Sequence, residues 1–398
     1  MKNILFLAVL LFSIDSFAQL TNENFISEIN ACLTINPING MCESSTYGIM
    51  PDWDVSQVTD MSWAFNDQIE FNGDISAWDV SNVTNMSFMF TSNPYSGGTA
   101  FNQNIGEWNV SNVTNMEMMF GRSTAFNQNI GDWNVSNVTD MSYMFLGANS
   151  FNQDIGNWDV SNVTEMHSMF TSAISFNQDI GGWNVSNVTN MISMFGNVNG
   201  PSPVPYTGAI SFNQDIGNWD VSNVDVMINM FKGATDFDQN ISGWNISNVT
   251  NMSQMLNSSG LSIVNYDSLL IGWSAQEVQP NVPLGALDLK YCLGESARQN
   301  LINTHNWSVL DDSLDCPVAN IFRPNELEIS IYPNPATKKV FIDWDNTPLH
   351  MALYDLLGNR VMNKTFTNYF DLGHLESGIY KAVISNGLKS TVKKIVKN

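Results

Sequence analysis

The chain has few basic residues, few histidines and no long apolar stretch. Lys and Arg total 15 against 38 Asp and Glu, a net charge of −23 in 398 residues. Because so acidic a chain repels phosphate backbones, a nucleic-acid-binding protein is not expected. The longest apolar stretch, residues 4–12, is well short of the roughly 20 residues that span a bilayer.

Catalytic motifs are lacking as well. The sequence contains no GxSxG, no HExxH and no phosphate-binding loop, and its histidines fall in separate regions: His167, His305, His350 and His374. Acidic residues are spread evenly through the chain, whereas catalysis requires one unlike site. We therefore expect a protein that is not an enzyme.

A leader and a change in charge divide the chain. Residues 1–18 combine Lys2, the apolar stretch and the small-x-small sequence Ser16-Phe17-Ala18, which predicts a secretory signal peptide; a buried N-terminal helix is the alternative. Residues 20–322 hold 4 basic and 30 acidic residues, whereas residues 323–398 hold 10 basic and 7 acidic. Two differently composed regions therefore share the chain.

Four cysteines lie outside the central section and suit an oxidising compartment. They are Cys32, Cys42, Cys292 and Cys316, and four cysteines allow three pairings. We expect the local pairs Cys32–Cys42 and Cys292–Cys316, because each bond would then pin one end of that section. A zinc site is the alternative, but it would need CxxC spacing or nearby histidines.

A tandem repeat fills the centre of the chain. Successive tryptophans are separated by 25, 30, 25, 25, 25, 36 and 25 residues, at Trp53, Trp78, Trp108, Trp133, Trp158, Trp183, Trp219 and Trp244. The unit is therefore 25 residues long, and the two longer gaps carry insertions at residues 92–99 and 196–208. Units of this size bury their apolar faces against their neighbours.

Two apolar spacings within a unit predict a strand followed by a helical segment. Ile155, Trp158 and Val160 alternate with polar residues, as in a short strand. The second half of the unit has the i, i+3, i+6, i+7 spacing of one helical stripe, at Val163, Met166, Met169 and Phe170. Thr164 stands at the N-cap position, and Thr114 with Glu117 forms a capping box. The expected fold class is an α/β repeat solenoid of the leucine-rich-repeat type, with about eight units over residues 51–256.

The columns formed by the repeat have alternative interpretations. The Trp, Met and Phe columns are either a continuous core or a row of exposed platforms for sugar rings, and their fixed phase with Val favours the core. Asp154, Asp179 and Asp215 share one column. Their carboxylates form either hydrogen-bonded turns and ladders or a site where Ca²⁺ bridges neighbouring units. No other cofactor is expected.

Different sequences flank the repeats. We expect an N-terminal cap over residues 19–50 and a C-terminal cap over residues 257–322, with a helix from Glu295 to Ile302. After a linker at Pro324, residues 326–398 alternate between short apolar stretches and turns, which predicts a small all-β sandwich of five to seven strands. Tyr206, among prolines in the 196–208 insertion, is the candidate contact residue, with a neutral loop as the alternative.

Two stretches resemble known families. The repeated WDVSNVTxMSxMF of residues 51–256 resembles the BspA-like leucine-rich-repeat surface proteins, a group also noted in mycoplasma lipoproteins. Residues 328–398 resemble the type IX secretion C-terminal sorting domain of Bacteroidetes, through IYPNP at 331–335, LYD at 353–355 and SGIY at 377–380. These resemblances imply Sec export, recognition of the tail by the type IX machinery, and a secreted or cell-surface protein. They also imply adhesion to a protein or glycan ligand through the repeats; a structural surface coat and a Ca²⁺-stabilised glycan-binding protein are the alternatives.

Overall fold

The computed structural model describes residues 19–197, 207–316, 327, 329–344, 347–355, 359–386 and 389–398. The chain divides into two compact units, Met1–Cys316 and Pro317–Asn398. The signal peptide predicted for residues 1–18, the linker at Pro324 and the candidate contact residue Tyr206 all lie outside the described residues.

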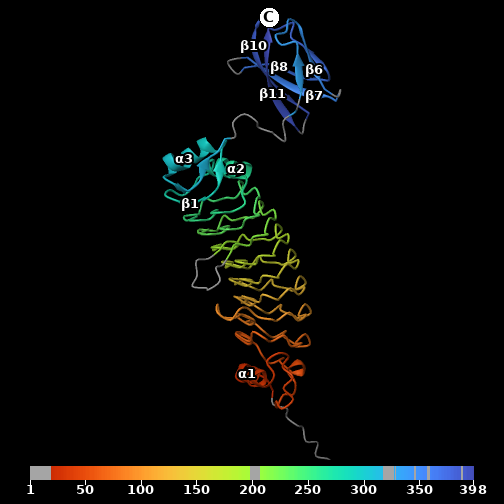
Figure 1. Cartoon of the computed structure of the whole chain (residues 1–398), viewed down its shortest axis with the longest axis vertical. Helices are drawn as coiled ribbons and strands as arrows, with labels where there is room; N and C mark the ends of the chain where they lie inside the picture. Colours follow the sequence, from red (N-terminus) through yellow and green to blue (C-terminus); the bar gives the residue numbers. More distant parts are fainter. Residues whose placement is uncertain are drawn as a thin grey trace, which may run out of the picture. The chain divides into compact units, whose positions relative to one another are not determined.

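In the first unit, the repeats form turn-rich coils that stack one upon the next (Figure 1). One residue of each coil pairs in parallel with the equivalent residue of the next, and we call it the bridging residue. The bridging residues are Asp60, Asn85, Asn115, Asp140, Glu165, Asn190, Val226 and Asn251. Positions within a coil are counted from them below.

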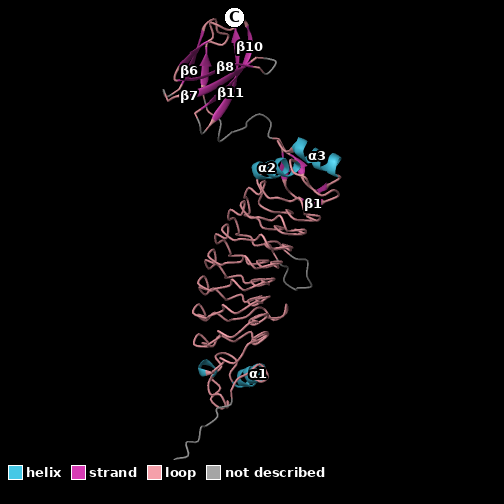
Figure 2. Ribbon diagram, turned by 180° about the vertical axis from the view of Figure 1, so that it is seen from behind, coloured by secondary structure: helices cyan, strands magenta, loops and turns pink. Residues whose placement is uncertain are grey.

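The predicted α/β solenoid of the leucine-rich-repeat type is wrong. Among the described residues, the helices α1 (Phe25–Ile35), α2 (Ile263–Ser274) and α3 (Glu295–His305) lie outside the repeats, and the short 3₁₀ helix η1 (Met50–Asp52) lies where the first repeat begins. Strand pairing between coils is limited to isolated single-residue bridges, and Figure 2 shows the repeats as loops. In the ranges that the structure describes, the small sheets occur in the C-terminal cap and the tail and not in the repeats.

Inter-coil hydrogen bonds explain why the expected helix does not form. The amides of Met166, Ser168 and Phe170 donate to carbonyls of the following coil at 3.3, 2.8 and 2.9 Å, instead of to carbonyls four residues earlier. Ser168 has a φ of 56°, in the left-handed region, where a right-handed helix cannot continue. Thr164 does not cap a helix either, since its hydroxyl donates to the Thr139 carbonyl of the preceding coil at 3.3 Å.

Apolar columns form the core of the stack, which confirms the core interpretation. Trp158 is 3% exposed, and Met166 and Phe170 are fully buried. Phe145 and Phe170, in adjacent coils, stack with ring centroids 5.7 Å apart. The core tryptophans from Trp108 to Trp244 also donate from the indole to an isoleucine carbonyl of the preceding coil, as Trp158 does to Ile130 at 3.1 Å. The core is therefore continuous from coil to coil.

Both ends of the stack are covered and pinned by a disulfide. At the N-terminal end, Phe25 of α1 packs edge-on against Trp78 at 5.7 Å. At the C-terminal end, the sequence expectation of a helix from residue 295 is confirmed by α3. Two parallel pairs, β1 with β3 and β2 with β4, complete this cap: β1 (Pro283–Gly285), β2 (Lys290–Tyr291), β3 (Ser308–Leu310) and β4 (Ser313–Leu314). The expected disulfides Cys32–Cys42 and Cys292–Cys316 are confirmed.

The tail is a small two-sheet β domain, as expected. Its sheets have the strand orders β11-β10-β7-β8 and β5-β6-β9, and one apolar cluster joins them, including Val340, Leu353 and Ile384. In β6, buried Val340 and Ile342 alternate with exposed neighbours, the pattern of a half-buried strand. The strands are β5 (Ser330–Tyr332), β6 (Lys339–Asp343), β7 (Leu349–Tyr354), β8 (Arg360–Phe366), β9 (Tyr369–Asp371), β10 (Gly378–Ser385) and β11 (Ser390–Lys397).

Candidate functional site

Variation between the repeats is concentrated on one side of the stack. The first and fifth positions after the bridging residue are Met and, in seven of eight coils, Phe, and they point into the core. The second and third positions differ strongly from coil to coil, and we call these two columns the variable face. The second column is Ser62, Ser87, Glu117, Ser142, His167, Ile192, Ile228 and Ser253; the third is Trp63, Phe88, Met118, Tyr143, Ser168, Ser193, Asn229 and Gln254.

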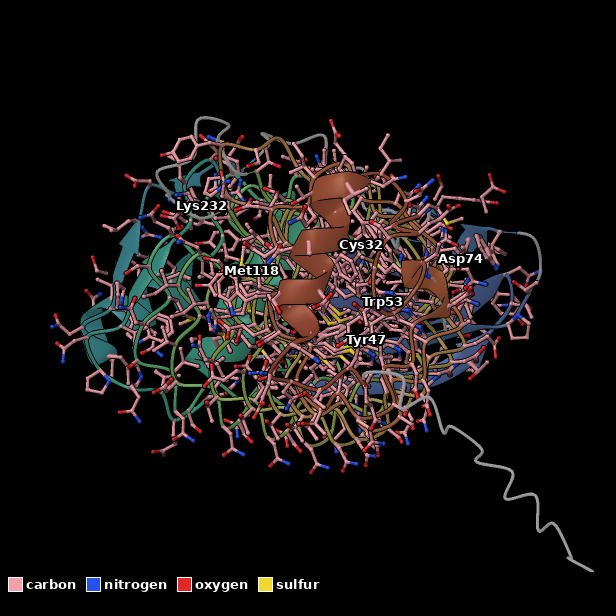
Figure 3. All side chains as sticks on the ribbon, turned by 90° about the horizontal axis from the view of Figure 1, so that it is seen from below. Cys32, Tyr47, Trp53, Asp74, Met118 and Lys232 are labelled. Carbon is pink, nitrogen blue, oxygen red and sulfur yellow. A yellow bond between two sulfur atoms is a disulfide. The ribbon has the colours of Figure 1, made fainter. Side chains whose placement is uncertain are left out.

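The variable face lies away from the regular polar columns. In Figure 3, Met118 and Lys232 lie toward one side of the stack. Asp74, which belongs to the same column as Asp154, lies toward the other side. Lys232 is at the sixth position of its coil. With Arg122, at the seventh position, it is one of only two basic residues between 51 and 256, so all the positive charge of the repeats borders the variable face. Burial lowers the pKa of both side chains.

The backbone of the third column is strained. All eight residues have φ between 52° and 63°, including Trp63 at 63° and Tyr143 at 58°, and none is glycine. Each left-handed non-glycine residue costs about 1–2 kcal/mol, which glycine would avoid. Strain that is retained in every coil indicates that side chains at this column serve a purpose other than the backbone turn.

An aromatic pair occupies the N-terminal end of the variable face. The rings of Trp63 and Phe88 lie parallel, 4.2 Å apart. Trp63 is 50% exposed, in contrast to the buried tryptophans of the core. An exposed indole in a fixed orientation offers apolar contact area with little loss of side-chain entropy on binding.

An acidic cluster lies at the middle of the variable face. His167 Nδ1 is 3.5 Å from Glu165 Oε2, and the His167 ring packs edge-on against Tyr143 at 4.5 Å. Burial raises the pKa of Glu117, and the nearby charge of Asp140 raises it further, whereas His167 opposes the shift. Burial and the charge of Glu117 raise the pKa of Tyr143. Glu117, Asp140, Tyr143, Glu165 and His167 therefore form one electrostatic group.

The carboxylates predicted as a Ca²⁺ site take part in local turns. Asp154, Asp179 and Asp215 each accept a hydrogen bond at 2.9 Å from the backbone amide two residues later, at Gly156, Gly181 and Gly217. Within the described ranges, no group of three or more His, Cys, Asp or Glu side chains is arranged to hold a metal ion. Ca²⁺ binding by these residues stays a prediction, and melting with and without EDTA would test it.

Sequence reasoning missed the variable face. In the sequence, His167 is only one of four histidines in separate regions, whereas in the fold its side chain is 26% exposed and belongs to the acidic cluster. The signal that could have found this face was present in the sequence. Aligning the eight units shows Met at the first position of every coil, but four residue types at the second position and seven at the third. The strain at the third column could not be read from the sequence.

The stack, the disulfide-pinned caps and the separate β tail define a repeat protein with an appended β domain. Residues 39–134, 91–202 and 205–279 match the family described as Mycoplasma protein of unknown function, DUF285. These matches together cover more than half of the chain, and the protein belongs to this family. No curated protein matches the chain.

The tail matches a second family. Residues 330–398 match the secretion system C-terminal sorting domain, so the expected type IX sorting domain is confirmed. This domain marks the protein for secretion to the cell surface or beyond by the type IX machinery. In the part of the chain that the structure describes, no helix has the length and apolar character needed to cross a membrane.

Proposed function

We propose that this exported protein binds a ligand on cells or matrix through the variable face, and that it acts by binding and not by catalysis. The observation that carries the proposal is the third column, where eight coils keep side chains at left-handed positions that glycine would occupy without strain. A purely structural coat has no need of side chains that differ from unit to unit at these strained positions.

The arrangement of the face supports binding over an extended surface. Every coil has at least one exposed or half-buried side chain at the second or third position. Weak contacts along such a row add up by avidity. The aromatic pair at one end and the acidic cluster in the middle give the row chemically distinct segments. A relationship to the BspA-like surface adhesins, suggested by the repeat motif, is part of the same proposal.

A binding assay with matched variants tests the proposal. The purified full chain would be applied to glycan arrays, matrix proteins and whole cells, together with a Trp63→Ser/Phe88→Ser variant and an Asp159→Asn control. Asp159 is an exposed residue that directly follows the core residue Trp158, and it lies outside the variable face. We expect saturable binding that the double variant lowers at least about tenfold, as for loss of an aromatic hot spot, and that the control leaves unchanged.

Two outcomes would contradict the proposal. If the wild-type chain binds to none of the glycans, matrix proteins or cells, the result would favour a structural coat protein. Equal binding by the wild type and by variants at the aromatic pair and the acidic cluster would place the contact surface elsewhere on the chain.

A further inference from the structure

Among the described residues, no lysine or arginine is paired with the carboxylates of the acidic cluster. Glu117, Asp140 and Glu165 contribute three carboxylates, and the positive group found against them in the described ranges is the imidazole of His167. Among the described residues, no side-chain or backbone donor hydrogen-bonds to the Glu117 carboxylate. A partly buried carboxylate without a donor is costly, and a bound cation would relieve that cost.

A second observation points to a missing hydrogen-bonding partner at the same place. Ser142 lies between Glu117 and His167 in the second column, since the Met118 amide donates to the Ser142 carbonyl and the Tyr143 amide donates to the His167 carbonyl. Its side chain is 1% exposed, and its Oγ has no hydrogen-bond partner. His167 Nδ1 is also buried and makes no hydrogen bond, although it lies near Glu165.

The chemistry of these groups selects the kind of cation. Metal ions prefer several oxygen ligands in a compact shell, and the described residues do not supply such a shell here. The aromatic rings of Tyr143 and His167 pack edge-on beside the carboxylates. A planar guanidinium can stack on an aromatic ring and donate up to five hydrogen bonds, whereas an ammonium group is a compact point charge.

We propose that the acidic cluster binds the guanidinium group of an arginine side chain on a partner protein. This inference rests on the proposed function of the variable face and names the chemical class of its ligand at one segment. The carboxylates of Glu117 and Glu165 accept from the guanidinium and Tyr143 provides the ring surface. Ser142, whose buried hydroxyl has no hydrogen-bond partner, lies between Glu117 and His167 in the second column.

A titration of the purified full chain tests the proposal. The probe is Nα-acetyl-arginine amide, and the signal is the NMR shift of the His167 imidazole, assigned with a His167→Gln variant. We expect a saturable shift with a Kd on the order of 1 mM. The lysine analogue should bind a few-fold more weakly, and the citrulline analogue, which has the same shape without charge, should not bind.

Matched variants separate specific binding from attraction to an acidic protein. Glu117→Gln and Asp159→Asn remove the same charge, but only the first lies in the cluster. Glu117→Gln should weaken arginine binding about tenfold and Asp159→Asn less than twofold. Tyr143→Leu, with its melting temperature checked, should weaken binding about threefold through loss of the ring.

Several results would overturn the inference. These are equal shifts with the citrulline analogue, equal weakening by Glu117→Gln and Asp159→Asn, or no saturable shift at all. Failure here is distinguishable from failure of the proposed function. If the Trp63→Ser/Phe88→Ser variant loses binding to cells or matrix while Glu117→Gln does not, the variable face binds its ligand without an arginine contact.

Discussion

The indole Nε1 of Trp158 donates a hydrogen bond to the carbonyl oxygen of Ile130, one coil earlier, at 3.1 Å. The same bond recurs in other coils, for example from Trp183 to Ile155 and from Trp244 to Ile216. The tryptophan column therefore fills the core and also satisfies backbone carbonyls that the coil geometry would otherwise leave without a donor.

Replacing Trp158 with Phe should destabilise the first unit by about 1–3 kcal/mol, because the buried Ile130 carbonyl loses its donor. Chemical denaturation would measure the change in the free energy of unfolding. The control is Trp63→Phe on the half-exposed face, expected to cost less than about 1 kcal/mol. Equal effects at the two positions would mean that the indole hydrogen bond contributes nothing.

Adjacent glycines should respond in opposite ways to alanine. A Cβ at Gly181 would collide with the Asp215 carbonyl oxygen of the next coil, whereas a Cβ at Gly182 would meet open space. Gly181→Ala should destabilise the stack by about 1–3 kcal/mol through this overlap. Gly182→Ala should be neutral or stabilise by up to about 1 kcal/mol, since it restricts the unfolded chain. Thermal melting of both variants would measure these changes in stability, and equal effects of the two substitutions would contradict the prediction.

Glu117→Gln should stabilise the protein at neutral pH. The pKa of Glu117 is raised in the fold above its ordinary value of 4.5, so the protonated form is favoured and stability is lost as pH rises through the folded pKa. The advantage of the variant should therefore disappear below about pH 4.5, where the carboxyl is neutral in both states. Asp159→Asn is the control, because hydrogen bonds from Ser161 lower the pKa of Asp159 and its charged form favours the fold.

Melting curves across pH would follow both variants. An advantage of Glu117→Gln that persists unchanged at low pH would contradict the electrostatic explanation and indicate a packing effect instead.

Removing the Cys292–Cys316 disulfide should loosen the C-terminal cap. The bond closes a loop of sequence separation 24, and a Cys292→Ser/Cys316→Ser variant should lose about 2–4 kcal/mol. Hydrogen exchange should then increase in α3 and β4 before it increases in the central coils. Uniform loss of protection throughout the stack would show that the cap and the repeats unfold together.

The repeat length, the core and both disulfides could be predicted from the sequence because each depends on spacing along the chain. Trp158, Met166 and Phe170 recur in fixed phase, and that phase alone indicates one shared interior. The helical segment was mispredicted because its i, i+3 spacing also arises from successive turns. The sequence contains no mark of the left-handed φ at Ser168 or of amides that bond to the next coil.

The candidate site was harder to predict because its residues come from different coils. Glu117 was assigned to a capping box with Thr114, yet the Thr114 hydroxyl donates to the Thr84 carbonyl of an earlier coil at 3.2 Å. Only the stacking register brings Glu117 to Ser142, Tyr143 and His167. Contacts across coils follow from three-dimensional register, which the sequence of one unit does not contain.

The helix α2 contacts the last repeat through the same tryptophan hydrogen bond that joins one coil to the next. Trp273 donates to the Ile241 carbonyl at 3.3 Å, as the tryptophans of the repeats do to the preceding coil. Gly272 allows the helix to approach that coil closely, since a Cβ there would lie 2.5 Å from the Ser242 carbonyl oxygen. The end piece thus fits any preceding repeat of the same register. Duplication or deletion of one 25-residue segment in the gene can lengthen or shorten the array without rebuilding its terminus, and each such event adds or removes one pair of variable-face residues.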